Sequence, residues 1–265
     1  MKRISLIQII KVAMVAGVLV MSWLSYPNLP DKMPMHWNLE GEVDNYWPKE
    51  KGVLVIPTIS MLMLMGFALL PSVDPKKKKY RLFKTEWEII QVGLLGFMTY
   101  ISGVTLYAAG HPNINVGTLI MVGTGALFIL MGNYLSKIRQ NWFIGIKTPW
   151  TLASEDNWNK THRFASWCFV VAGVVILTGV SLGLLMPVLL IGGIILASLL
   201  PLTYSFLLFK KQERLMKPVL AGLMLVLLLM MALRLVTGED NWICQNGRWV
   251  AHGNPSAAMP VDKCR

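Results

Sequence analysis

The sequence predicts an all-α integral membrane protein: a bundle of seven transmembrane helices with a small, disulfide-stapled extracytoplasmic tail at its C-terminus. The first observation is composition. Of the 265 residues, 54% are apolar and only 15% are charged, against about 25% charged in ordinary soluble domains. The second is length, because seven apolar stretches approach the ~20 residues that a spanning helix needs: residues 9–26, 52–70, 87–109, 116–135, 164–185, 187–209 and 218–236.

The third observation is the sorting of basic residues along the chain. If the N-terminus is cytoplasmic, most of the 25 Lys and Arg residues fall in segments that face the cytoplasm, as topology determination by positive charge requires. This role accounts for the net charge of +11, and direct nucleic-acid binding is not expected. We therefore expect a multi-pass protein of the cell membrane with an extracytoplasmic C-terminus.

The first apolar stretch resembles a signal peptide but is expected to remain as a helix. Lys2 and Arg3 precede the apolar run, and the bulky sequence around Trp23 offers no small-residue cleavage site. Lys11 lies about one turn into the helix, where its ammonium group can reach the inner interface along its own apolar stem.

The first outer loop, residues 26–51, combines prolines with interfacial aromatic residues and is not a regular helix at its start. It contains an ordered motif, called here the outer-loop motif: Pro34, His36, Trp37, Asn38, Gly41, Asp44 and Tyr46. Two interpretations remain open. His36 and Asp44 contact an extracellular ligand or metal, or His36 and Asn38 hydrogen-bond within a compact loop folded onto the helix ends.

The next helices carry two signals. The basic run 74–81 is expected to set topology and attract anionic lipid, worth about 1 kcal/mol per basic residue near the surface; a protein partner is the alternative. Small residues favour close approach between membrane helices, and the fourth stretch contains Gly117, Gly123, Gly125 and Gly132.

The C-terminal third predicts a tight turn and a stapled hairpin. Residues 164–209 are too long for one crossing, so Pro187 should divide two helices after a turn at Gly183. In the tail, Asn246-Gly247 between short apolar-rich runs predicts a β-hairpin. Cys244 and Cys264 are expected to pair in an oxidising exterior, with two free thiols or a metal-binding pair as the alternatives. Cys168 should pack inside a helix. The pairing would close a loop worth about 3 kcal/mol.

Residues 133–163 are polar, basic and aromatic, and they are too long for a plain turn. Gly145 permits a close turn, and Pro149 bars the preceding residue from helical geometry. Ser154 can cap a following helix that places Trp158 and His162 on one face.

This segment resembles the signature of the SdpI family of bacterial membrane immunity proteins. The matching positions are Gly132, Asn133, Lys137, Asn141, Phe143, Gly145, Ile146, Lys147, Thr148, Pro149, Trp150, Thr151, Leu152, Trp158, Lys160, Thr161, His162 and Arg163. The outer-loop motif is similar to a module that often precedes such proteins. The resemblance divides the chain into a two-helix module (1–75), a four-helix core (76–215), and an additional seventh helix with its tail (216–265).

The resemblance implies resistance to a secreted, membrane-active peptide toxin, with signalling by recruitment of a cytosolic repressor to the membrane. The binding surface would be residues 133–163, facing the cytoplasm, and the outer loops would face the toxin. A transporter or channel for a small solute, lipid or peptide is the alternative, although the helix centres lack charged residues of the kind that couple ions. No catalytic motif, metal-binding motif or cofactor site is recognised, so we do not expect an enzyme.

Overall fold

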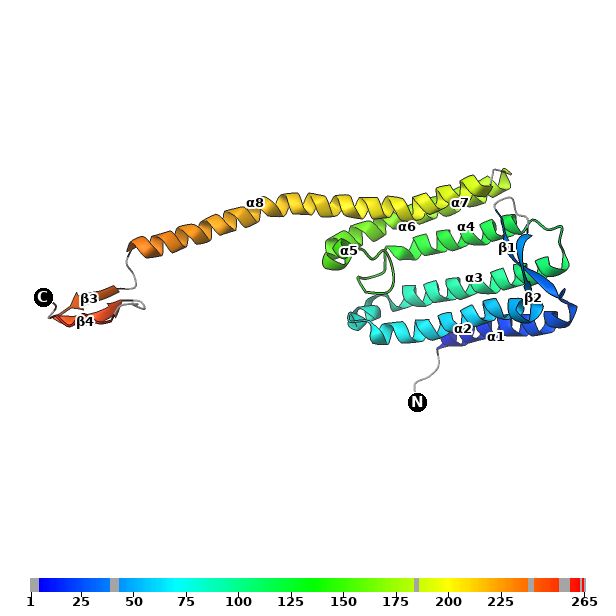
Figure 1. Cartoon of the computed structure of the whole chain (residues 1–265), viewed down its shortest axis with the longest axis horizontal. Helices are drawn as coiled ribbons and strands as arrows, with labels where there is room; N and C mark the ends of the chain where they lie inside the picture. The colour runs from blue at the N-terminus through cyan, green and yellow to red at the C-terminus, as the bar shows by residue number, and fades with distance from the viewer. Residues whose placement is uncertain are drawn as a thin grey trace. The chain divides into compact units, whose positions relative to one another are not determined.

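The computed structural model is mostly helical and describes residues 5–38, 43–183, 186–237, 241–252, 258–262 and 264. Gly41 of the outer-loop motif lies outside these residues. The chain forms two compact units, Met1–Phe209 and Lys210–Arg265. The helices of the first unit are α1 (Leu6–Ser25), α2 (Lys49–Val73), α3 (Lys84–Gly110), α4 (Val116–Leu135), α5 (Pro149–Ala153), α6 (Glu155–Ser181) and α7 (Met186–Ile194), followed by the start of α8 (Leu200–Thr237) (Figure 1).

Six helical segments of the described chain are long and apolar enough to cross a membrane. They are Leu6–Asn28, Lys49–Val73, Lys77–Gly110, Val116–Leu135, Glu155–Ser181 and Val188–Arg214. These spans make the chain a multi-pass membrane protein. The last of them passes from α7 through a single π-helical turn, η3 (Ile195–Leu199), into α8.

The predicted boundary between a sixth and a seventh helix differs from the structure. We expected a cytoplasmic connection near residues 210–217, but the described backbone of α8 is helical from Leu200 to Thr237. Residues 210–217 consist of Lys, Gln, Glu, Arg, Leu and Met, which all favour helices, so polarity there does not require a turn. The count of seven separate helices is therefore not confirmed.

Small residues bring α4 and α6 into close contact, as their positions predict. A Cβ atom on Gly173 would lie 2.5 Å from the Gly125 carbonyl oxygen, and one on Gly132 would lie 2.8 Å from the Ser166 carbonyl oxygen. The Ser166 hydroxyl also donates a hydrogen bond to the Gly132 carbonyl. Close backbone approach of this kind is a common basis of helix association in membranes.

The first outer loop is a β-hairpin, which the sequence analysis did not predict. Strand β1 (Lys32–Trp37) pairs antiparallel with β2 (Val43–Pro48), with register irregularities between Pro34 and Trp37. Met33 of β1 packs in a small core with Leu29 and Val53. The hairpin lies at one end of the helices of this unit, and the connection between α4 and α6 lies at the other (Figure 1).

Lys11 of α1 is buried against a neighbouring helix. Lys11 is only 9% exposed, and its ammonium group donates to the Gln91 side chain of α3. The side chain therefore reaches a neighbouring helix, and its predicted reach to the inner interface stays a prediction. Farther along the chain, the predicted turn after α6 contains Gly183 with a φ of +68°.

The second unit contains the predicted hairpin and disulfide. Strand β3 (Asn241–Gln245) pairs with β4 (Arg248–His252), and Cys244 lies opposite Trp249. Asn246 and Gly247 have φ angles of 50° and 72°, as a tight two-residue hairpin turn requires. Cys244 and Cys264 form the disulfide, and the Trp249 indole donates to the Asp262 carbonyl at 2.7 Å.

Candidate functional site

The connection between α4 and α6, residues 136–154, begins with a turn built around the Asn141 side chain. Asn141 is fully buried. Its Oδ1 accepts from the backbone N–H groups of Phe143 (2.9 Å) and Ile144 (2.7 Å), and its Nδ2 donates to the carbonyls of Arg139 (2.9 Å) and Ile144 (3.0 Å). An amide has two donors and one acceptor oxygen, so one side chain supplies a complete set of local partners.

His162 closes the same turn from α6. Its Nδ1 donates to the Trp158 carbonyl at 2.8 Å, and its Nε2 accepts from the Ile146 N–H at 3.0 Å. These partners define a neutral ring with its proton on Nδ1. Gly145 has a φ of +108°, and a Cβ atom there would lie 2.3 Å from His162 Nε2. Glycine is therefore required for the backbone to approach the imidazole.

The short helix α5 is fixed at its start by a reciprocal cap. The Thr148 hydroxyl accepts from the Thr151 N–H (3.2 Å), and the Thr151 hydroxyl accepts from the Thr148 N–H (2.8 Å). Pro149 occupies the first helical turn, where its missing N–H has no cost. Gln140 adds hydrogen bonds to the carbonyls of Thr151 and Leu152 at 2.8 and 2.9 Å.

Two tryptophans fasten the connection to the surrounding helices. Trp158 is fully buried and donates from its indole to the Ile138 carbonyl at 2.8 Å. Trp150 donates to the Ser205 hydroxyl of α8 at 2.8 Å. The predicted Ser154 cap is present, because its hydroxyl accepts from the Asn157 N–H at 3.2 Å. The side chain of Asn157 in turn donates to the Ser205 carbonyl at 3.0 Å.

Asp74 is a buried part of this site that sequence reasoning missed. It is 2% exposed and accepts from the Trp142 N–H (3.0 Å), the Tyr80 hydroxyl (3.0 Å) and the Lys76 N–H (2.6 Å). The sequence analysis treated it as the start of a basic run that sets topology. Its partner Trp142 is 68 positions away, and no local pattern in the sequence marks such a contact.

The basic run itself folds onto the connection. Residues Lys77–Phe83 form a 3₁₀ segment, η2. Lys79 lies 3.0 Å from the Glu155 carboxylate at the start of α6, and the Lys76 ammonium donates to the Gln140 side chain. Burial lowers the pKa of Lys76, and repulsion from the Lys79 ammonium lowers it further. The run therefore makes specific contacts in addition to any effect on topology.

The predicted signature residues divide into a buried frame and an exposed set. The frame comprises Gly132, Asn141, Thr148, Thr151, Trp158, Thr161 and His162, with Gly145, Ile146, Trp150 and Leu152 partly covered. The exposed signature residues are Asn133, Lys137, Phe143, Lys147, Pro149, Lys160 and Arg163, and Arg139 and Trp142 are exposed beside them. Only this exposed set is available to a partner without rearrangement of the connection.

The exposed set is cationic and aromatic. The Lys147 ammonium donates to the Phe143 backbone carbonyl at 2.8 Å, and Phe143 is 38% exposed. Trp142 is 49% exposed. Lys137 lies 5.0 Å from the centre of the Tyr134 ring, and Lys160 pairs with Asp156 at 2.7 Å. Such a surface suits an acidic or amphipathic partner.

The outer-loop motif is brought together mainly by hairpin pairing. His36 Nδ1 and Asp44 Oδ1 are 2.6 Å apart on the exposed side, and Pro34 lies opposite Tyr46. Trp37 packs beside Val104, Ala108 and Val116. Both side chains of this pair remain partly exposed, so the contact is compatible with either interpretation of the motif. No group of three or more His, Cys, Asp or Glu side chains among the described residues could hold a metal ion.

The spans and the connection define the class of this chain: a multi-pass helical membrane protein with a rigid polar connection at one end of its helices. The model of the SdpI/YfhL protein family matches residues 137–238, and that of a domain of unknown function, DUF1648, matches residues 13–61. The Immunity protein SdpI of Bacillus subtilis (strain 168) is 28% identical over 196 residues, covering 72% of this chain and 92% of that protein. By these matches the chain is similar to the SdpI family. No solved structure matches it.

Proposed function

We propose that this protein is a membrane immunity protein that protects its cell from a secreted, membrane-active peptide toxin. The observation that carries the proposal is the similarity to Immunity protein SdpI, which extends over 92% of that relative. A match over 196 residues is much longer than the connection alone, which supports a shared role for the protein and not only a shared motif.

The two ends of the first unit would then have different tasks. We infer that the β1–β2 hairpin end faces the exterior and the toxin, while the α4–α6 connection faces the cytoplasm. The exposed set around Lys147 and Trp142 would recruit a cytosolic repressor to the membrane. Support for this division comes from the basic residues gathered at the connection and from the buried frame that holds their backbone in place.

In this proposal the domains keep the boundaries inferred from the sequence. Residues 1–75 form the outer-hairpin module, residues 76–215 the core with the connection, and residues 216–265 a C-terminal segment with an extracytoplasmic, disulfide-bonded tail. The family match extends into this segment as far as residue 238. An oxidising exterior is consistent with the Cys244–Cys264 bond.

The direct test of immunity is survival of toxin-sensitive bacteria that express the full chain. The cells are exposed to a panel of membrane-active peptides that includes one known to kill bacteria lacking SdpI. Cells that express the chain should survive better than cells that carry an empty vector. Unchanged survival against the entire panel, with the protein present in the membrane fraction, would contradict the proposed function.

A matched pair of variants tests the role of the connection. Lys147→Ala removes an exposed cation beside Phe143, and Lys78→Ala removes an exposed cation of η2 that is not part of the exposed set. We expect Lys147→Ala to reduce the toxin response and Lys78→Ala to leave it unchanged, at equal protein abundance. Equal toxin responses in the two variants would show that the exposed set has no specific role in immunity.

A further inference from the structure

A groove of about 980 Å³ lies within the first unit between α1, α2, η2 and α3. Its walls are largely apolar and come from helices that span the membrane, with Ile9 and Val12 on α1 and Leu64, Phe67 and Ala68 on α2. The immunity proposal assigns no role to this groove. Its volume lies at the upper end of the range for small-molecule sites.

The polar end of the groove carries an excess of positive charge. Four cationic side chains and one carboxylate line it: Lys11, Lys77, Arg81 and Lys84, with Glu88. Glu88 lies 3.8 Å from Lys84, and Lys11 donates to Gln91. Lys77 and Arg81 form no ion pair with any carboxylate in the part of the chain that the structure describes. Two exposed cations are therefore available where the apolar walls end.

A buried donor without a partner lies on the same groove. Trp87 is 6% exposed and lines the groove, and its indole N–H has no acceptor among the described residues. Its ring packs against Phe67 at 5.3 Å between ring centres, which holds the indole in place. The indole N–H itself is closed off from solvent, so Trp87 contributes its ring to the apolar wall of the groove.

We propose that this groove binds one anionic phospholipid. An acyl chain would lie along α1 and α2 against the Trp87 ring, and the phosphate would lie beside Lys77 and Arg81. A free anion would leave the apolar walls uncovered. A zwitterionic lipid would place an ammonium group near the two free cations. Basic pockets between transmembrane helices are known to hold anionic headgroups.

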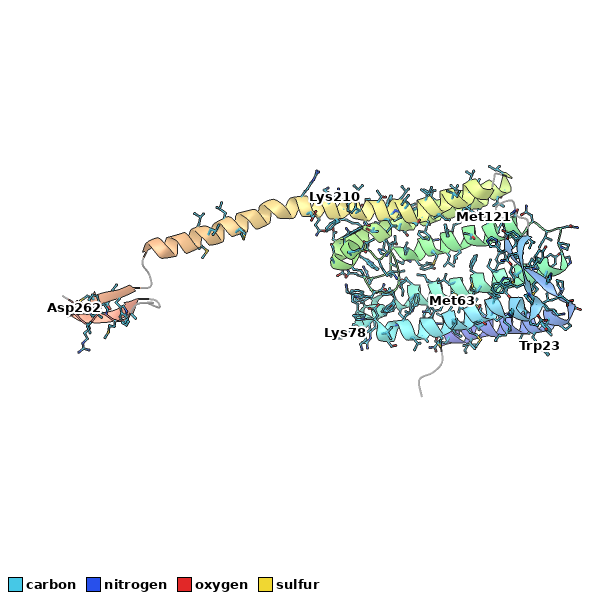
Figure 2. The ribbon with its side chains drawn as sticks, in the orientation of Figure 1. Trp23, Met63, Lys78, Met121, Lys210 and Asp262 are labelled. Atoms are coloured by element: carbon cyan, nitrogen blue, oxygen red, sulfur yellow. A yellow bond between two sulfur atoms is a disulfide. The ribbon has the colours of Figure 1, made fainter. Side chains whose placement is uncertain are left out.

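The test is lipid binding to the purified full chain in detergent, followed by native mass spectrometry with phosphatidylglycerol or phosphatidylcholine. The wild type should retain one phosphatidylglycerol in preference to phosphatidylcholine. Lys77→Ala and Arg81→Ala should each weaken retention about fivefold, the effect of one basic contact. The matched control is Lys78→Ala, since Lys78 is an exposed residue of η2 that does not line the groove; it lies at the same end of the helices (Figure 2).

A second variant tests the apolar part without changing any charge. Ala68→Trp places a large ring in the groove and should lower phosphatidylglycerol retention, while circular dichroism and elution volume remain those of the wild type. The proposal is overturned if Lys78→Ala weakens binding as much as Lys77→Ala, because diffuse surface charge then accounts for it. Equal retention of both lipids, or retention of a peptide in place of lipid, would also overturn it.

Discussion

His162 has both ring nitrogens engaged, one by the Trp158 carbonyl and the other by the Ile146 N–H. A fully buried imidazole with two internal partners is a structural residue, and its position in the signature reflects the need to hold the turn at Gly145. The sequence analysis placed His162 and Trp158 on one helical face, and the stacked rings, 4.0 Å between centres, confirm this placement. It could not show which backbone group the imidazole would meet.

Gly145→Ala tests this contact. The added Cβ would lie 2.3 Å from His162 Nε2 at a φ of +108°, and strained backbone of this kind costs about 1–3 kcal/mol. We expect the thermal unfolding midpoint of the purified protein to fall by several degrees. Gly17→Ala is the control, since a Cβ there meets nothing within 4 Å and alanine is the better helix former. Equal midpoints for the two variants would show that the His162 contact does not constrain the turn.

At the scale of elements, Asp74 joins two segments that the sequence treats as separate. The carboxylate follows the end of α2 and accepts from Tyr80 of η2 and from the backbone of Trp142. The basic run is thereby attached to the connection instead of being a solvated linker. Local patterns predicted the Asn246-Gly247 hairpin and the Ser154 cap because their partners are within a few residues. They missed the Asp74 contacts, which depend on the packing of distant helices.

We therefore expect Asp74→Asn to destabilise the protein. An amide in place of the carboxylate presents N–H groups toward donors that need an acceptor, and an unsatisfied buried group costs about 1–3 kcal/mol. Asp156→Asn is the matched control, because Asp156 is exposed and pairs only with Lys160 four residues along α6, a contact worth about 0.3–0.5 kcal/mol. Limited proteolysis near Trp142 and thermal unfolding measure the effect. A larger loss of thermal stability in Asp156→Asn than in Asp74→Asn would show that the Asp74 contacts to Tyr80 and Trp142 do not stabilise the protein.

Two elements show why strands and helix ends were harder to predict than spans. The β1–β2 hairpin has Pro34 inside a strand and an irregular register, so it lacks the regular alternation by which strands are recognised. In α8, strong helix formers continue a helix through the polar residues where we expected a connection. Hydropathy identified the apolar segments because spanning helices have a characteristic length, whereas polarity alone does not define a turn.

For the whole molecule, the proposed function depends on which end of the first unit faces the cytoplasm. The helices of the first unit separate a hairpin end from a basic connection end, and Trp23 and Lys78 lie near these opposite ends (Figure 2). The positive-inside rule predicts that the connection faces the cytoplasm, and this orientation stays a prediction. A toxin that acts from outside and a repressor that acts from inside would then meet different ends of one rigid unit.

Cysteine labelling in intact cells measures this sidedness directly. Cys244 and Cys264 are joined, and Cys168 is buried, so a single new thiol on the surface reports its own location. We expect Asp31→Cys, at a side chain that is 97% exposed in the wild type, to react with a membrane-impermeant maleimide in intact cells. Lys147→Cys should react only after the membrane is permeabilised. Labelling of Lys147→Cys from the medium, with Asp31→Cys protected, would contradict the account.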